Sequence, residues 1–251
     1  MILDVLRLQL VFSDMMVPLF FDSYLRYFLH HDTRLWQLLI DHIILVVDSV
    51  WLALWIGVPL GVLITYNDRL AGAVLWLAGI MLTIPSIALF GLLIPVVGIG
   101  KIPVVIALVL YAQLPIIRNT YIGLTQVDPA IIEAGKGMGM SRWQRLRQIQ
   151  IPKAVPVIMA GVRNAVVLLV GIAAIGAYIG AGGLGDPIFD GINGAYPAQI
   201  VVATVILALL ALAFDYGFGM VEQLFRRRNG EDIDPSFITR FIRRRRQTAA
   251  T

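Results

Sequence analysis

The sequence predicts an all-α membrane protein with about five transmembrane helices. Of its 251 residues, 59% are hydrophobic and only 14% are charged, whereas soluble domains carry about 45–50% apolar and about 25% charged residues. The mean hydropathy of +0.82 supports the same class. Several stretches without charge reach the roughly 20 residues that a helix needs to cross a bilayer. The chain contains no cysteine, which excludes disulfides, thiolate metal sites and a cysteine nucleophile.

The charge-free runs place the spans along the chain. We expect them near residues 43–66, 71–97, 102–122, 155–180 and 197–221, within a transmembrane domain of residues 36–225. Charged residues interrupt every apolar run of residues 1–35 before it reaches membrane length. We therefore expect an N-terminal arm or interfacial helix there, with a sixth span as the alternative.

Lysine and arginine predict the orientation, because cytoplasmic loops are enriched in both. If the connection after the third span is cytoplasmic, fifteen of the twenty basic residues fall on that side. The N-terminus is then outside and the C-terminus is cytoplasmic. Residues 226–251 form a basic cytoplasmic tail, which we expect to contact anionic membrane lipid. Because topology explains the segregated basic residues, we expect no nucleic-acid partner.

The connection between the third and fourth spans, residues 127–153, is longer than the about 2–8 residues of an ordinary helix–helix turn. Asp128 and Pro129 predict a helix start, and Ser141 predicts the cap of a second short helix over residues 142–149. Pro152 is expected to close the segment. A partly apolar, partly basic helix pair fits a groove on another protein or, alternatively, the membrane surface.

The spacing within this connection resembles the cytoplasmic loop of permease subunits of bacterial ABC importers. That pattern is E-A-A, three residues, G, nine residues and I-x-L-P. It occurs here at Glu133, Ala134, Gly135, Gly139, Ile149, Ile151 and Pro152. Glycine replaces the second alanine at position 135, and isoleucine replaces the leucine at position 151. We call residues 127–153 the coupling segment.

The resemblance extends to residues 85–124, 136–152 and 176–192, which are similar to the osmoprotectant branch of these importers. It implies a type I ABC importer permease fold in the bacterial inner membrane. It further implies ABC ATPase subunits that bind ATP and Mg, a second permease chain (the same or homologous) and an extracytoplasmic substrate-binding protein. The implied substrates are glycine betaine, carnitine, choline and related quaternary amines. An importer of methionine or another amino acid is the alternative.

The sequence shows no motif for nucleotide binding, metal binding or catalysis by this chain. The only Gly-Lys pairs have no phosphate-loop spacing, so ATP must bind to a partner, and we expect no cofactor in this chain. The GxGxxG over residues 180–185 follows a span, so we expect it to form an irregular outer end of that span near the place where substrate enters. His30, His31 and His42 match no metal spacing and are expected at the surface. We therefore predict no catalytic or metal site; an ion-coupled secondary transporter and a membrane-embedded enzyme are the rival classes.

Ionisable and aromatic residues within spans suggest a translocation path, because charges inside a bilayer are costly. The candidates are Asp48, Trp51, Tyr178 and Arg163. Three of them have a structural alternative: a helix-packing hydrogen bond for the aspartate, an interfacial belt for the tryptophan and snorkelling for the arginine. Gly57 and Gly61 predict a close helix–helix contact.

Overall fold

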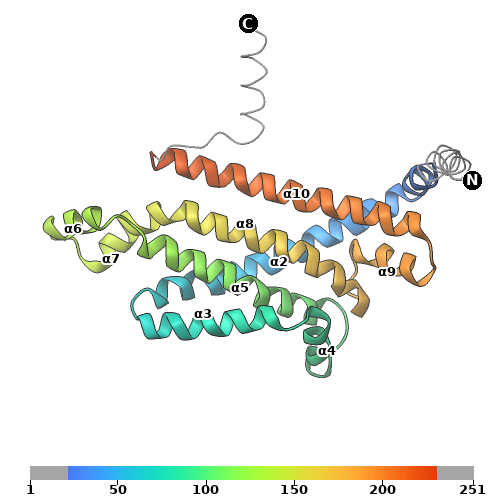
Figure 1. The fold of residues 1–251 in the computed structure, drawn as a ribbon, viewed down its shortest axis with the longest axis horizontal. Coiled ribbons are helices and arrows are strands. Elements are labelled where there is room, and N and C mark those ends of the chain that lie inside the picture. The colour runs from blue at the N-terminus through green and yellow to red at the C-terminus, as the bar shows by residue number, and fades with distance from the viewer. Residues whose placement is uncertain (1–21, 231–251) are drawn as a thin grey trace, which may run out of the picture.

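The computed structural model describes residues 22–230, and within that range the chain is built of helices without strands (Figure 1). Residues 1–21 of the expected N-terminal arm lie outside the described residues. Most of the segment in which a sixth span was the alternative therefore lies outside them as well. Residues 231–251 of the basic tail also lie outside them.

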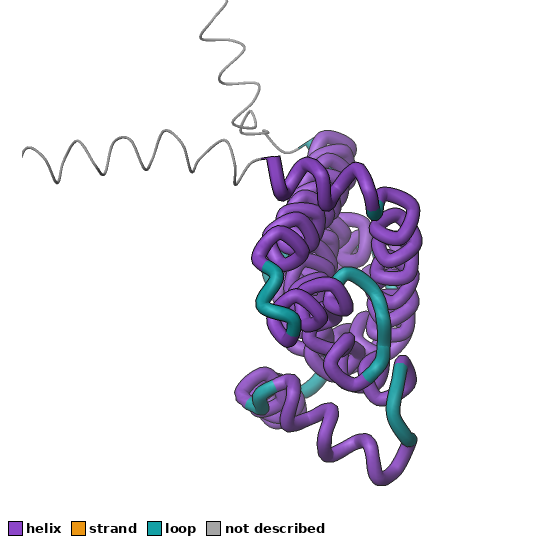
Figure 2. Tube along the Cα trace, turned by 90° about the vertical axis from the view of Figure 1, so that its right-hand side faces the viewer, coloured by secondary structure: helices purple, strands orange, loops and turns teal. Residues whose placement is uncertain are grey.

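A helical segment over residues 22–30 precedes the first labelled helix. The elements that follow are α2 (Asp32–Ile64), α3 (Asp68–Thr83), α4 (Ser86–Val97), α5 (Lys101–Thr125), α6 (Pro129–Gly137), α7 (Arg142–Arg145), η1 (Leu146–Gln150), α8 (Ile151–Gly176), η2 (Ala177–Ile179), α9 (Gly185–Asn193) and α10 (Pro197–Arg228). Short loops join them (Figure 2).

Four helical stretches are long and apolar enough to cross a membrane: α2, α5, the run from α7 through η2, and α10. The pair α3 and α4 passes the same criteria together, which gives up to five spans. This agrees with the all-α fold and the number of spans that the sequence predicts. The helix of the first span, α2, starts at Asp32 rather than near residue 43. Residues 32–42 belong to the same helix as the predicted span.

The second span differs from its prediction as one helix over residues 71–97. It breaks between Thr83 and Ser86, and its two halves are bent by 98°. Pro85 restricts the residue before it to an extended backbone, and Ile84 has φ −75° and ψ 126°. The hydroxyl of Tyr111 donates a 2.8 Å hydrogen bond to the carbonyl oxygen of Ile84. This bond satisfies one of the carbonyls that the break leaves open.

The helix α5 lies at the centre of the bundle, packed against α2 and α8, while α10 covers α8 from outside (Figure 1). In the most apolar part of each helix, 56% of the residues of α5 are buried but only 17% of those of α10. The predicted close contact at Gly57 and Gly61 is confirmed. A Cβ atom at Gly61 would lie 2.5 Å from Cβ of Thr120, and one at Gly57 would lie 2.8 Å from Cγ2 of Ile116.

The two ends of the bundle are distinct. The short helices α6 and α7 project at one end, where α10 also finishes (Figure 1). We call this the coupling end. The helix α9 and the start of α2 lie at the opposite end. The predicted irregular backbone of residues 180–185 is confirmed, since Gly180, Gly182 and Gly183 all have φ near +80° and interrupt the helix between η2 and α9.

Candidate functional site

The coupling segment folds into a hairpin whose first arm is α6. As predicted, the carboxylate of Asp128 caps this helix by accepting a 2.8 Å hydrogen bond from the backbone N–H of Ala130. At its other end, the N–H of Met140 donates to the carbonyl of Gly135 and the N–H of Gly139 donates to that of Lys136. These two bonds define a Schellman turn. Gly139 has φ +78°, the left-handed conformation that such a turn requires and that glycine adopts without strain.

The second arm begins with a capping box. The hydroxyl of Ser141 accepts from the N–H of Gln144, whose side chain in turn accepts from the N–H of Ser141. The prediction of a separate short helix closed by Pro152 is wrong, because the helix continues from Arg142 to Ile179 as one stretch. Proline lacks an N–H for the normal helical bond. The five residues of η1 form a π-helix just before it, a rare element that occurs mostly as a single turn inside α-helices.

The two arms touch at positions of the motif. A Cβ atom at Gly135 would lie 2.9 Å from Cδ1 of Ile149 and 3.3 Å from Cδ of Arg145. The guanidinium of Arg145 also donates to the carbonyl of Met140 in the turn. The pattern of the coupling segment therefore places a small residue on one arm opposite an isoleucine on the other. The sequence did not indicate that Arg145 stabilises the turn.

The remaining motif residues divide into an exposed and a packed group. Glu133 and Ala134 are exposed on α6, and the Glu133 carboxylate forms a 2.6 Å ion pair with Lys136 one turn later. Ile151 packs beside a buried cluster that joins α5, η1 and α8, whereas Pro152 is exposed. Glu133 thus does not cap its own helix, because Asp128 does.

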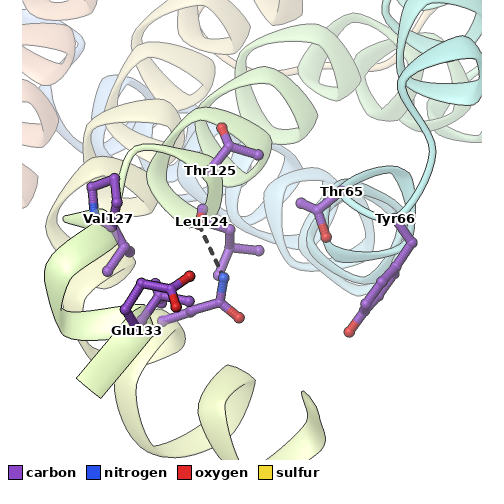
Figure 3. A pocket seen from close by; sticks show the side chains of 9 residues that line it. Thr65, Tyr66, Leu124, Thr125, Val127 and Glu133 are labelled. Carbon is purple, nitrogen blue, oxygen red and sulfur yellow. Dashed lines mark hydrogen bonds between the residues drawn. The ribbon is translucent and has the colours of Figure 1, made fainter. Parts of the chain in front are cut away.

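A cavity of about 340 Å³ separates α6 from the ends of α2 and α5. Figure 3 shows Glu133 on one side of it and Tyr66 on the other. Beside it, the side-chain amide of Gln150 donates a 3.4 Å hydrogen bond to the carbonyl of Leu124 near the end of α5. This bond joins the coupling segment to α5, and the cavity lies between the segment and the ends of α2 and α5.

Large apolar side chains are exposed at the tip of the hairpin. Met138 is 73% exposed and Trp143 is 64% exposed. Exposed tryptophan and methionine beside arginine are typical of protein–protein contact surfaces. The hairpin therefore presents a surface suited to a protein partner, on a base fixed to the spans.

The structure does not bring the four predicted path residues together. Asp48 and Trp51 are exposed on α2, where the ring of Trp51 contacts that of Trp55 at 6.0 Å. Tyr178 is exposed in η2 and its ring lies 5.5 Å from that of Phe189. No hydrogen bond or ion pair involves Asp48 within residues 22–230.

Arg163 belongs to an ion-pair network that joins α8 to α10. Its guanidinium makes a bidentate contact with Asp215, at 2.6 and 2.7 Å. It also lies 3.7 Å from Glu222, which pairs at 2.9 Å with Arg226. Gly219 leaves room for the guanidinium, since a Cβ there would lie 3.3 Å from Nη1. Arg163 and Asp215 are 52 residues apart in the sequence, and no sequence pattern indicated that they pair.

His42 is buried, in contrast to the expectation of a surface histidine. Its exposed fraction is 0%. Its Nδ1 accepts a 3.3 Å hydrogen bond from the N–H of Leu184, so Nε2 carries the proton and donates to the carbonyl of Val170 at 3.1 Å. Gly183 approaches the imidazole closely, because a Cβ there would lie 2.8 Å from Nδ1. His42 thus joins α2 to α8 and to the glycine-rich loop before α9.

Comparisons with known proteins agree with this geometry. A family model described as "Binding-protein-dependent transport system inner membrane component" matches residues 57–228. The chain is 47% identical over 197 residues to the osmoprotectant import permease protein OsmW of Salmonella typhimurium, which covers 76% of this chain and 92% of that relative. It is 41% identical over 183 residues to the glycine betaine/carnitine/choline transport system permease protein OpuCB of Bacillus subtilis, covering 73% and 84%.

The fold is similar to a solved structure of the MetNI methionine ABC transporter in an inward-facing conformation. The TM-score is 0.67 at 26% identity, with 76% of this chain and 95% of that chain covered. The importer-permease fold that the coupling motif implied is thereby confirmed. Since the family model spans more than half of the chain, the protein belongs to the binding-protein-dependent transport system inner membrane components and is a multi-pass permease of the ABC transporter class.

Proposed function

We propose that the chain is the transmembrane subunit of an ATP-driven importer of osmoprotectants such as glycine betaine and related quaternary amines. The observation that carries this proposal is the 47% identity to an osmoprotectant import permease over three quarters of the chain. The coupling hairpin supports it, because its two arms carry the motif residues and touch at Gly135 and Ile149.

The partners are ABC ATPase subunits, a second permease chain (the same or homologous) and an extracytoplasmic substrate-binding protein. The ATPase subunits bind ATP and Mg and hydrolyse the nucleotide. They dock on the hairpin, and the exposed side chains of Met138 and Trp143 supply apolar contact area. The Glu133 carboxylate, already within an exposed ion pair, exchanges Lys136 for a basic group of the ATPase at little cost, because exposed ion pairs contribute only about 0–1 kcal/mol.

The orientation follows from the same docking. The coupling end faces the cytoplasm together with the end of α10 and the basic tail of residues 226–251, while the first residues of α2 and the helix α9 face outward. Tyr178 then lies at the outer end, where the substrate-binding protein delivers the solute. Asp48 and Trp51 lie on an exposed face of α2 and remain predictions for the path. Arg163 is held by Asp215 and joins α8 to α10.

The test is reconstitution of the permease with its ATPase and binding protein in vesicles, followed by uptake of labelled glycine betaine. We expect uptake that needs ATP and all components. Uptake by the permease alone, driven by an ion gradient, would support a secondary transporter instead. Competition by methionine but not by glycine betaine or choline would indicate an amino-acid importer.

A further inference from the structure

A cavity of about 570 Å³ opens at the side of the bundle between α3, α5 and α8. Its size falls within the roughly 300–1,000 Å³ of small-molecule sites. One part of its wall is apolar, with Leu82, Leu114 and Leu168 among its residues, and the other part carries Arg118, Asn119 and Asn164. None of the path residues predicted from the sequence lines it.

Arg118 is the charged residue among those that line this cavity. It lies seven residues before the end of α5 at Thr125, about 10 Å along the helix axis. Its side chain is exposed and makes no hydrogen bond or ion pair with residues 22–230. Arg163, in the middle of α8, is by contrast paired with Asp215. An arginine within a span is costly unless an anion or water meets it, or its side chain snorkels to the interface. Arg118 lines the cavity together with two asparagines, which offers it polar neighbours there.

The two asparagines give this polar space a fixed wall. The amide of Asn119 donates a 2.8 Å hydrogen bond to the carbonyl of Pro115, which leaves its oxygen as an acceptor. A Cβ at Gly161 would lie 2.5 Å from Cβ of Asn119, so α8 packs directly against this residue. Asn164 lies three residues further along α8, is exposed and makes no hydrogen bond in the described part of the chain. Lipid tails can bond neither the open oxygen of Asn119 nor the amide of Asn164.

We propose that this cavity is a solute site on the translocation path, and that Arg118 pairs there with the carboxylate of a zwitterionic solute. A guanidinium recognises a carboxylate through two parallel hydrogen bonds, and Asn119 and Asn164 add single ones. The leucine wall contacts the methyl groups of the quaternary ammonium. This inference rests on the proposed function and adds a chemical distinction: glycine betaine and carnitine carry the carboxylate, whereas choline carries a hydroxyl group instead.

The first test uses uptake by the complete reconstituted importer. In the Arg118→Gln variant, we expect uptake of glycine betaine and carnitine to fall at least tenfold more than that of choline, while Arg118→Lys retains at least a third of the wild-type rate. Arg69→Gln is the matched control, since Arg69 is exposed at the start of α3 and lies outside the cavity. ATP hydrolysis stimulated by the binding protein shows that the variant complex is intact. An equal change for all three solutes, or equal loss with lysine and glutamine, would overturn the assignment.

The second test measures access to water, and the reaction rates without solute do not depend on which solute is imported. Because the chain has no cysteine, Arg118→Cys and Asn164→Cys each introduce a single thiol into the complete importer. We expect a charged thiosulfonate reagent to modify both at least ten times faster than Leu212→Cys on the exposed face of α10. We also expect glycine betaine to slow modification at least threefold. Modification of both thiols as slow as that of Leu212→Cys would overturn the proposal. Such slow rates are expected if Arg118 instead faces lipid and pairs with a lipid phosphate. If the wild type imports no osmoprotectant yet these thiols react fast, the proposed function fails while the path assignment stands.

Discussion

Substitution of Gly139 by alanine isolates the conformational requirement of the coupling hairpin. The residue has φ +78°, and a Cβ atom built on it would have no neighbour within 4 Å. The cost therefore comes from the backbone conformation alone, at about 1–2 kcal/mol for a residue with a Cβ in the left-handed region. Since about 1.4 kcal/mol corresponds to a factor of ten in an equilibrium constant, we expect the closed turn to open about 5–30 times more often.

Hydrogen exchange reports this change directly. The backbone N–H of Met140 donates to the carbonyl of Gly135 across the turn, so its exchange rate follows the opening equilibrium. We expect this amide to exchange about 5–30 times faster in Gly139→Ala and only slightly faster in Gly139→Asn, because asparagine tolerates the left-handed region. In the complete importer, the alanine variant should hydrolyse ATP with less uptake per nucleotide.

Gly137 provides the matched control. It lies two residues earlier, as the last residue of α6, and a Cβ there would also have no neighbour within 4 Å. Gly137→Ala should stabilise the helix by at most about 1 kcal/mol, the value for a helix interior, and slow exchange at Met140 or leave it unchanged. If both alanine variants raise exchange equally, or neither does, the Schellman turn does not control the stability of the hairpin.

Three further predictions concern contacts outside the hairpin. Arg163→Met should destabilise the protein by about 1–3 kcal/mol because it leaves Asp215 without its partner, and adding Asp215→Leu should recover part of this loss; additive losses in thermal unfolding would show that the pair contributes nothing. His42→Ala should cost about 2–4 kcal/mol, from a cavity and two lost hydrogen bonds, and should speed amide exchange at Leu184; unchanged exchange there would exclude the bond to the imidazole. Burial, together with the nearby Asp190, raises the pKa of the Asp186 carboxyl above its ordinary value, outweighing the attraction of Arg34. The folded state thus binds this proton more tightly than the unfolded state, and stability falls as pH rises from about 4 through the raised pKa. Asp186→Asn should therefore raise the melting temperature at pH 7 but not below about pH 4; an equal effect at both pH values would contradict this assignment.

Local signals in the sequence predicted the local structure well. Asp128 before Pro129 and Ser141 before residue 142 were predicted as helix caps, and both caps form as expected. The same holds for Gly57 and Gly61, whose missing side chains let α2 approach α5. In each case the physical cause lies within a few residues of the chain or in the size of one residue.

The predictions that failed concern the direction of a helix after a bend, or the contacts of a residue with partners far away in the sequence. An uninterrupted apolar run carries no information on whether its helix bends, although Pro85 held the signal for a break at Ile84. His42 looked like a surface residue because its partners, Val170 and Leu184, are more than 120 positions away. The pairing of Arg163 has the same origin. Long-range contacts of single polar residues leave no periodic pattern in a sequence.

The helix α8 connects several of these features. Its helical stretch begins within the coupling hairpin at Arg142 and runs without a break to Ile179. Along this length it carries Arg163 toward α10 and Asn164 toward the cavity, and Val170 accepts the hydrogen bond of His42. In the proposed function, an ATPase that displaces the hairpin therefore moves the cavity wall and the outer loop together, because a continuous helix transmits displacement along its axis.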